Sequence, residues 1–180
     1  MFKIKSELLD QKKISKAISR ISFEICEKFS SLDNLAIVGI KTRGEILANR
    51  IVGNLHSNSK VKIDYGILNV TFYRDDFSSN LGSPKIGPSE IDFDVNNRNI
   101  ILVDDVLYTG RTIRAAMNEI FSFGRPNSIK LAVLVDRGHR EVPIKADFVG
   151  KNYPTSDNEH IHVQVNEVDG YERVVLVEYQ

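Results

Sequence analysis

The chain has 180 residues, and its 24 Lys and Arg residues balance its 24 Asp and Glu residues, so the formal net charge is zero. Hydrophobic residues make up 42% of the chain without forming a long apolar segment, which argues against a membrane span and a signal peptide. We therefore expect one globular domain over residues 1–180, in the cytoplasm, and the neutral charge lends no support to a nucleic-acid partner.

The first part of the chain predicts a helix, a strand, a helix and a strand in turn. A buried strand is expected at residues 35–40, a helix near residues 45–55 and an alternating strand over residues 61–71. Before them, residues 11–29 predict an amphipathic helix, because apolar side chains recur at helical spacing: Ile14, Ile18, Ile21, Ile25 and Phe29.

The middle of the chain predicts a loop followed by a strand, a helix and a strand. Residues 78–88 are rich in Asn, Gly and Pro and predict a mobile loop. Continuous apolar runs at residues 100–103 and 131–135 predict strands buried on both faces, with a helix of roughly residues 113–123 between them. Successive strands joined through helices require crossovers, which predicts an α/β fold with a central parallel sheet and flanking helices.

The end of the chain predicts a different arrangement. Two short β runs, at residues 161–165 and 174–179, follow the parallel part of the chain. We expect them to form a small C-terminal hood, contributed mainly by about residues 149–180.

The most informative segment is residues 99–112, Asn-Ile-Ile-Leu-Val-Asp-Asp-Val-Leu-Tyr-Thr-Gly-Arg-Thr. Its strand delivers Asp104 and Asp105 to the carboxyl end, where open α/β sheets bind ligands. Residues 109–112 then bring hydroxyls, a glycine and a cation to the positive end of a helix, which suits a phosphate monoester. The carboxylates suit sugar hydroxyls or water-held Mg²⁺. Together these groups describe a phosphorylated ribose, although paired acids after a strand can also simply cap a helix.

Two further loops carry cations next to expected strands. Lys41-Thr42-Arg43-Gly44 follows a buried strand and could hold a diphosphate, although a basic residue there is often only part of a solvated turn. Tyr73-Arg74-Asp75-Asp76 is either a charged turn or a group in which Arg74 touches diphosphate. In the second interpretation, residues 78–88 close over the site and exclude water.

Residues 99–112 resemble the phosphoribosyl pyrophosphate (PRPP) motif of type I phosphoribosyltransferases. The resemblance implies that Asp104 and Asp105 bind the ribose hydroxyls, that residues 109–112 bind the 5′-phosphate, and that Arg43 meets the leaving group. It also implies a diphosphate site made of Lys41, Thr42, Arg43 and Arg74. The implied PRPP-binding residues are Ile100, Ile101, Leu102, Val103, Asp104, Asp105, Val106, Leu107, Tyr108, Thr109, Gly110, Arg111 and Thr112.

Two departures from the purine-salvage members of that family indicate the base. Those members have an Asp at the variable position of the motif and a Lys after the next buried strand, whereas this chain has Tyr108 and Asp136. An ionised Asp cannot donate a hydrogen bond to a purine carbonyl, so a pyrimidine is favoured. His139, in the following loop, is either a general base or a packing contact.

Four segments together resemble the PyrR family of bifunctional pyrimidine operon regulators and uracil phosphoribosyltransferases: residues 38–44, residues 71–76, the PRPP motif with its Tyr108, and residues 134–141. The resemblance implies the conversion of uracil and PRPP to UMP and diphosphate, with Mg²⁺ held by substrate and water rather than by direct protein ligands. It further implies that Arg137 and Val163 lie near the base, and that the protein is a homodimer or a higher homo-oligomer.

The same resemblance implies a regulatory role, in which the UMP-bound protein binds a hairpin in the leader mRNA of a pyrimidine operon. A His of the family's RNA surface is Phe23 here, which could stack on a base or become buried in a subunit contact. A uracil salvage enzyme without an RNA role, and a transferase for another base, remain open. The implied RNA-binding residues are Lys16, Ser19, Arg20, Lys28, Arg140, Lys145 and Lys151.

Overall fold

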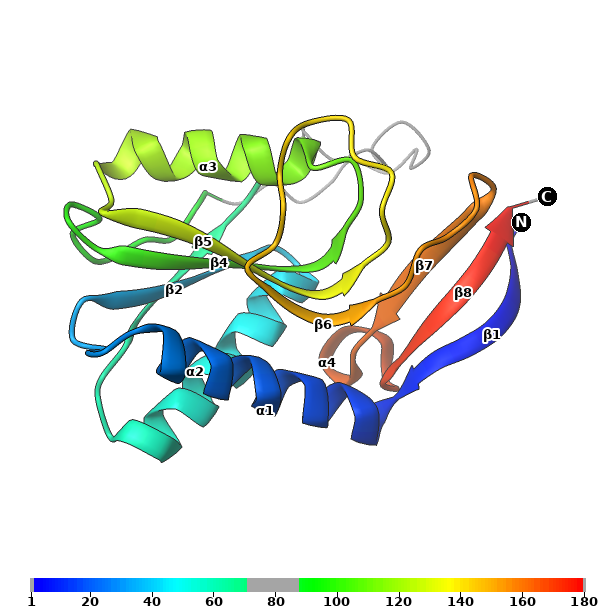
Figure 1. Cartoon of the computed structure of the whole chain (residues 1–180), viewed down its shortest axis with the longest axis horizontal. Coiled ribbons are helices and arrows are strands. Elements are labelled where there is room, and N and C mark those ends of the chain that lie inside the picture. Colours follow the sequence, from blue (N-terminus) through cyan, green and yellow to red (C-terminus); the bar gives the residue numbers. More distant parts are fainter. Residues whose placement is uncertain (1, 71–87, 180) are drawn as a thin grey trace.

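Two sheets organise the computed structural model, which describes residues 2–70 and 88–179 (Figure 1). Five parallel strands form the larger sheet in the order β3-β2-β4-β5-β6, and three antiparallel strands form the smaller one in the order β1-β8-β7. Helix α3 covers one face of the larger sheet, and α1 and α2 cover the other (Figure 1). Within the described part of the chain, no helix is both long and apolar enough to cross a membrane.

The elements follow one another as the alternating pattern requires. Their bounds are β1 (Phe2–Asp10), α1 (Gln11–Lys28), β2 (Leu35–Ile40), α2 (Arg43–Ser59), β3 (Asp64–Leu68), β4 (Asn99–Leu107), α3 (Arg111–Phe123), β5 (Ser128–Asp136), β6 (Phe148–Asn152), β7 (Glu159–Gln164), α4 (Asn166–Asp169) and β8 (Arg173–Tyr179). The predicted α/β class, the parallel sheet and its flanking helices are confirmed.

The local patterns located most elements closely. Strand β2 has the predicted bounds, and α1 ends one residue before its predicted end. Strand β3 begins later than the predicted residue 61, because its pairing with the neighbouring strand β2 runs from Ala36↔Asp64 to Ile40↔Leu68. The loop expected at residues 78–88 lies outside the described residues, apart from its last position.

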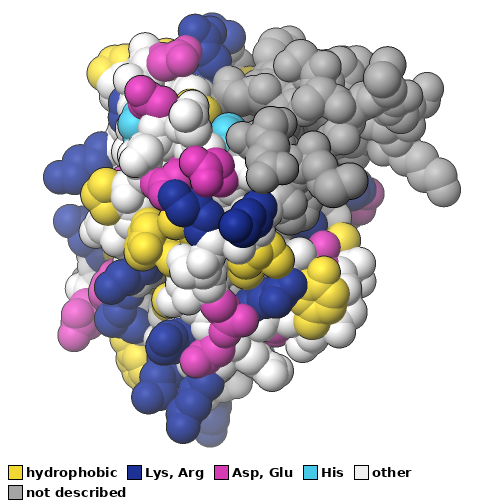
Figure 2. Space-filling view, turned by 90° about the vertical axis from the view of Figure 1, so that its right-hand side faces the viewer, with side chains coloured by type: hydrophobic (Ala, Val, Ile, Leu, Met, Phe, Trp, Pro, Cys, Tyr) yellow, Lys and Arg dark blue, Asp and Glu magenta, His cyan; other side chains and the backbone are white. Residues whose placement is uncertain are grey.

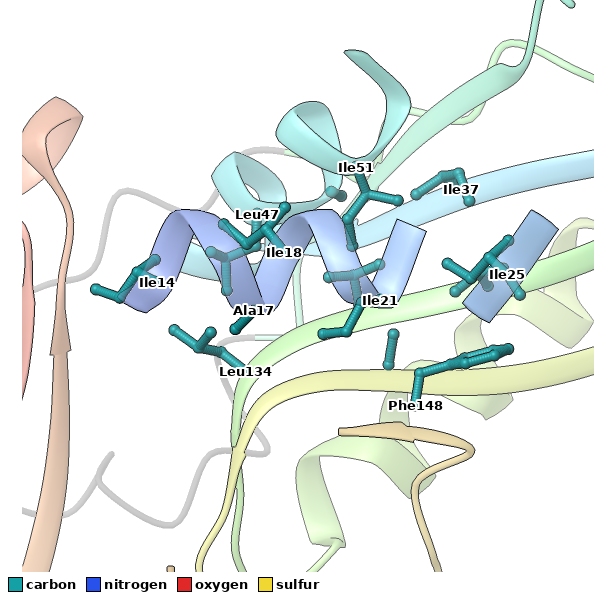
Figure 3. Close-up of a cluster of buried hydrophobic side chains, with 14 of the residues drawn as sticks. Ile14, Ala17, Ile18, Ile21, Ile25, Ile37, Leu47, Ile51, Leu134 and Phe148 are labelled. Carbon is teal, nitrogen blue, oxygen red and sulfur yellow. The ribbon is translucent and has the colours of Figure 1, made fainter. Parts of the chain in front are cut away.

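The core fills both faces of the larger sheet. Ile101 and Val103 of β4 face the cluster under α1 and α2, whereas Ile100 and Leu102 face the cluster under α3. All four side chains are at most 1% exposed, which confirms a strand buried on both faces. Figure 3 shows the first cluster, in which the apolar stripe of α1 lies against α2 and the sheet: Ile14, Ala17, Ile18, Ile21, Ile25, Ile37, Leu47, Ile51, Leu134 and Phe148.

The hood differs from its expected bounds of about residues 149–180. Strand β6 pairs in parallel with β5 and so belongs to the larger sheet. Strand β1, which no local signal indicated, pairs with β8 along its length. The hood therefore consists of β1, β7, α4 and β8, and it joins the two ends of the chain, a long-range pairing that periodicity within one segment cannot reveal.

Candidate active site

The sheet opens at one point, beside the carboxyl end of β2. Strand β4 pairs with β2 only as far as Gly39↔Val103, but it continues beside β5 as far as Leu107↔Asp136. Chain connections leave in opposite directions from this point, because β2 leads to β3 on one side and β4 leads to β5 on the other. Such a switch point is where open α/β sheets bind ligands.

Asp104 and Asp105 lie on β4 just beyond the end of its pairing with β2. Asp104 is 5% exposed, and its Oδ1 accepts a hydrogen bond from the Asp105 N–H at 2.9 Å. Asp105 Oδ1 accepts from the Val106 N–H at 2.9 Å. Backbone donors thus orient both carboxylates at the switch point between β2 and β4, which we call the crevice, and these oxygens are the acceptors that sugar hydroxyls need.

Helix α3 begins at Arg111, six residues after Asp105, so its N-terminus lies at the same end of the sheet as the pair. Gly110, its N-cap, has a φ of 90°, and a Cβ there would lie 2.7 Å from Val142 Cγ2, so only glycine fits. Thr109 Oγ1 accepts from the Arg111 N–H at 3.2 Å. Arg111 itself extends outward and pairs with Glu141 at 2.6 Å. The backbone of this turn, more than the Arg111 side chain, therefore offers donors to a phosphate.

Helix α2 brings the second predicted loop to the same place. A Cβ on Gly44 would lie 2.6 Å from the Val103 carbonyl oxygen and 3.1 Å from Asp104 Cα, so the first turn of α2 rests directly on the end of β4. The Lys41 Nζ lies 3.9 Å from Glu90 Oε1. The backbone N–H of Lys41 donates to the Leu68 carbonyl at 2.8 Å. The structure thus brings together the two segments that the sequence singled out.

Arg43, the first residue of α2, reaches the hood. Its Nη2 donates to Asp169 Oδ1 at 2.9 Å, and the two side chains are 29% and 17% exposed. Its Nε is buried and has no hydrogen-bond partner among the described residues. Nothing in the spacing of the sequence indicated this contact, because 126 residues separate the partners.

The donor set at the crevice fits a magnesium ion that arrives with a phosphorylated substrate. Mg²⁺ in such sites keeps several water molecules and binds phosphate oxygens of the substrate. Asp104 and Asp105 would hold such an ion through its water ligands and the substrate rather than as direct ligands. Across the described residues there is no cluster of three or more His, Cys, Asp or Glu that could hold a metal by itself.

The side of the crevice next to the hood is built around a buried cation. Arg137 is 3% exposed and follows β5, and its guanidinium lies over the Tyr108 ring, 3.9 Å from the centroid. Its donors bind the hood: Nε donates to Thr155 Oγ1 at 3.0 Å, Nη1 to His160 Nδ1 at 3.3 Å, and Nη2 to the Glu159 carbonyl. The donors of Arg137 are thus engaged by the protein, and its predicted place near the base stays a prediction.

Three other predicted residues have structural partners in this region. Asp136 accepts from the Gly138 N–H and from Arg140 Nη2, so its two carboxyl oxygens are engaged within this loop. His139 Nε2 contacts the Thr155 carbonyl at 2.6 Å, and its ring packs edge-on against Tyr108, which favours the packing interpretation. Val163 is 3% exposed and belongs to the core cluster.

Comparisons with known proteins decide the family. The model of the phosphoribosyl transferase domain matches residues 5–169. "Bifunctional protein PyrR" of Caldicellulosiruptor bescii is 52% identical over 170 residues, covering 94% of this chain and 93% of that protein. The protein of the same name from Clostridioides difficile is 51% identical over 174 residues, covering 97% and 98%. The chain belongs to the PyrR family of phosphoribosyltransferases.

Solved structures agree with this assignment at the level of the fold. A hypoxanthine phosphoribosyltransferase from Trypanosoma cruzi matches with a TM-score of 0.75 and 18% identity, over 97% of this chain and 96% of that one. A hypoxanthine-guanine phosphoribosyltransferase from Bacillus anthracis matches with a TM-score of 0.72 and 17% identity, over 99% and 100%. The predicted type I phosphoribosyltransferase fold is confirmed.

The RNA-binding residues that the PyrR family implies fall into two groups. Arg20 Nη2 donates to the carbonyls of Val149 and Gly150 at 3.1 and 2.6 Å, which brings α1 against the edge strand β6 and its exposed Lys151. The exposed Lys16 and the partly buried Ser19 lie on the same part of α1. The structure thus places these four residues on neighbouring elements.

The other predicted RNA contacts lie apart from this group or are engaged within the protein. Lys28 is exposed, but it is 12 residues beyond Lys16, about 18 Å along the helix. Arg140 donates to Asp136, to the Ile144 carbonyl at 2.9 Å and to the Tyr108 carbonyl at 2.7 Å, so it shapes its own loop. Figure 2 shows both Lys and Arg and Asp and Glu on the hood side.

Some predicted site residues lie outside the described residues. These are Arg74, with its neighbours Tyr73, Asp75 and Asp76. Conversely, sequence reasoning missed Asp169, Thr155 and His160, which contact the predicted residues Arg43 and Arg137. Only the fold brings these partners together, because their positions in the sequence follow no local pattern.

Proposed function

We propose that this protein transfers the phosphoribosyl group of PRPP to uracil, giving UMP and diphosphate, and that with UMP bound it regulates pyrimidine biosynthesis genes through their leader mRNA. One observation carries the enzymatic part. The buried Asp104 and the neighbouring Asp105 lie between two helix N-termini, those of α2 and α3. This arrangement offers hydroxyl acceptors flanked by two anion sites, which matches a ribose that carries phosphate groups at both ends.

The ribose and its 5′-phosphate take the α3 side of the site. The backbone donors of residues 109–112 bind the phosphate, and Gly110 allows the close approach. Asp104 and Asp105 accept hydrogen bonds from the ribose hydroxyls. Their negative charge also favours the positive charge that develops on the sugar ring as the bond to diphosphate breaks.

The diphosphate takes the α2 side of the site. Lys41, Thr42, Arg43 and, from outside the described residues, Arg74 bind it, and the positive end of α2 adds to the attraction. Mg²⁺, when bound, neutralises part of the leaving group's charge. Exclusion of water from the site would limit hydrolysis of the reactive sugar.

Uracil takes the side next to the hood, near Tyr108 and Arg137. The Asp136 carboxylate is already paired with Arg140 and cannot donate to a purine carbonyl. This supports a pyrimidine over hypoxanthine or guanine. UMP, the product, keeps its phosphate and ribose in the PRPP subsites, so one site serves both catalysis and sensing.

The regulatory part depends on the surface of α1 and β6. Lys16, Ser19, Arg20 and Lys151 contact RNA phosphates, so binding weakens as salt rises. Lys28, Arg140 and Lys145 complete the proposed RNA-binding set, and the exposed Phe23, 57% accessible on α1, can stack on an unpaired base. The protein acts in the cytoplasm, where leader mRNA is transcribed, as a homodimer or a higher homo-oligomer.

The transferase is tested by following UMP and diphosphate formation from PRPP, Mg²⁺ and uracil, with hypoxanthine and guanine as competing bases. We expect turnover with uracil and little with either purine. A faster rate with a purine would contradict the assignment of Tyr108 and Asp136 to a pyrimidine site.

The regulatory role is tested by titrating the protein with RNA from its own pyrimidine-gene leader, with and without UMP, at two salt concentrations. The regulatory role would be supported if the protein bound the leader RNA tightly, bound it more tightly with UMP, and bound a scrambled RNA weakly. Weak binding that disappears with salt, alongside intact turnover, would instead leave the alternative function, a uracil salvage enzyme without an RNA role.

A further inference from the structure

Arg43 is held by a carboxylate that belongs to a different part of the fold. Asp169, at the end of the hood helix α4, accepts from Arg43 Nη2 at 2.9 Å. The Asp169 side chain is 17% exposed and the Arg43 side chain 29%, so solvent screens this pair less than it would screen an exposed one. The cation proposed to bind diphosphate thus already has an anionic partner.

Asp169 is fixed in place by its own backbone contacts. Its Oδ2 accepts from the Val165 N–H at 2.8 Å, and its N–H donates to the Val165 carbonyl at 2.8 Å. Gly170 follows in the left-handed region with a φ of 75° and ends the helix. The Asp169 carboxylate is therefore a rigid acceptor. If the ion pair breaks, the side chain that moves is the longer and more flexible one, that of Arg43.

The guanidinium of Arg43 is incompletely satisfied in this arrangement. Its Nε is buried without a hydrogen-bond partner among the described residues, on a group that can present its donors to two acceptors at once. A buried donor of a charged group without an acceptor is uncommon in folded proteins. Its position, at the first residue of α2 and directly before Gly44, which rests against Asp104, favours an anion in the crevice as the missing acceptor.

We propose that Asp169 is a positioning residue for the diphosphate site: it holds Arg43 when the site is empty and yields the guanidinium to diphosphate when PRPP binds. This inference rests on the proposed phosphoribosyl transfer. Diphosphate and the Asp169 carboxylate are both anions and compete for the same donors, so each lowers the affinity of Arg43 for the other.

A second set of ion pairs holds the hood on α2 while Arg43 exchanges Asp169 for diphosphate. Arg50, seven residues after Arg43 on α2, pairs with Glu172 at 2.6 Å and with Glu167 at 2.9 Å. These contacts flank Asp169 in the sequence and bind the same part of the hood to α2. The hood therefore stays attached to α2 when Arg43 leaves Asp169, and only the arginine side chain moves.

The test measures the affinity of the full-length protein for inorganic diphosphate with Mg²⁺ by calorimetry. Asp169→Asn keeps an oxygen that accepts from the Val165 N–H but removes the competing charge, so diphosphate should bind about fivefold more tightly. The KM for PRPP should fall in parallel. Glu167→Gln is the matched control, because it removes one hood carboxylate that contacts Arg50 rather than Arg43, and its diphosphate affinity should equal that of the wild type.

The possible outcomes separate this inference from the proposed function. Unchanged or weaker diphosphate binding in a folded Asp169→Asn variant would overturn the role of Asp169. Absence of diphosphate binding in the wild type would overturn the proposed transferase instead. A measurement on the wild type covers the case in which the variant misfolds: the Arg43 Nε–H resonance, assigned with Arg43→Lys, should shift when diphosphate is added, and an unchanged resonance would also overturn the exchange.

Discussion

The guanidinium of Arg137 stacks on the ring of Tyr108, with its central carbon 3.9 Å from the ring centroid. Arg137 follows β5 and Tyr108 follows β4, so the contact joins the ends of two central strands. The same guanidinium also donates to Thr155, His160 and the Glu159 carbonyl. One buried cation therefore links the hood to the ends of β4 and β5.

Replacing this cation should loosen the contact between the hood and the end of β5. Arg137→Met keeps an apolar side chain of similar length but leaves three partly buried acceptors without this donor, so the free energy of unfolding should fall by about 3 kcal/mol. The KM for uracil should rise more than the KM for PRPP. Urea denaturation and steady-state kinetics measure both effects. Tyr108→Phe, which keeps the stacked ring, is the control and should unfold like the wild type.

The paired carboxylates should be indispensable for transfer. Asp104→Asn combined with Asp105→Asn removes the charge that stabilises the developing cation of the sugar, and kcat should fall by about 100-fold or more. Asp33→Asn should leave kcat unchanged, because Asp33 lies before β2, at the amino end of the strand and away from the paired carboxylates. Rates of UMP formation from uracil and PRPP measure the effect, and retained turnover in the double variant would contradict the ribose assignment.

Substituting either of two glycines of α2 by alanine should change the stability of the protein, but in opposite directions. Gly44→Ala places a Cβ 2.6 Å from the Val103 carbonyl, so α2 must move away from β4, which should cost about 1–3 kcal/mol and weaken PRPP binding. Gly53→Ala meets no atom within 4 Å and should stabilise the helix by about 0.5–1 kcal/mol. Thermal melting with and without PRPP separates the two, and equal effects would argue against the close packing of Gly44.

Arg20 should affect both RNA binding and the edge of the sheet. Arg20→Ala removes a phosphate-binding cation and also exposes the carbonyls of Val149 and Gly150 on the edge strand β6. Lys16→Ala removes only a cation from the same helix. In each variant, the slope of the logarithm of the RNA-binding constant against the logarithm of the salt concentration should fall in magnitude by about one. Hydrogen exchange along β6 should increase in Arg20→Ala alone. Equal exchange in the two variants would mean that Arg20 does not protect β6.

The stability of the protein should fall in mild acid because of His160. Burial, followed by the charge of Arg137, holds the pKa of His160 below its ordinary value of 6.5. The unfolded chain therefore takes up this proton at a higher pH than the folded chain, so stability decreases as the pH drops below about 6.5 and levels off below the folded pKa. Urea denaturation at pH 7.5 and 5.5 measures the decrease. His160→Asn keeps an acceptor for Arg137 without titrating, and the same decrease in that variant would exclude His160 as its source.

Local patterns in the sequence predicted much of the fold and the residues on both sides of the crevice. The continuous apolar run before Asp104 identified a strand buried on both faces, and the spacing of Ile14, Ile18 and Ile21 identified the helix that covers it. These predictions succeeded because burial and periodicity depend on residues that are close together in the chain. Strand β1 escaped prediction because its partner, β8, lies at the other end of the chain.

The sequence by itself determined the fold class and the family, and it predicted which residues carry the chemistry of the site. The tertiary structure decided what those residues contact: Arg43 pairs with Asp169, Arg140 with Asp136, and Arg137 with the hood. A cation in a sequence has no preferred partner, because the nearest carboxylate or carbonyl depends on how distant segments cross. Folding supplied that geometry by placing the N-terminal turn of α2 between the end of β4 and the short helix of the hood.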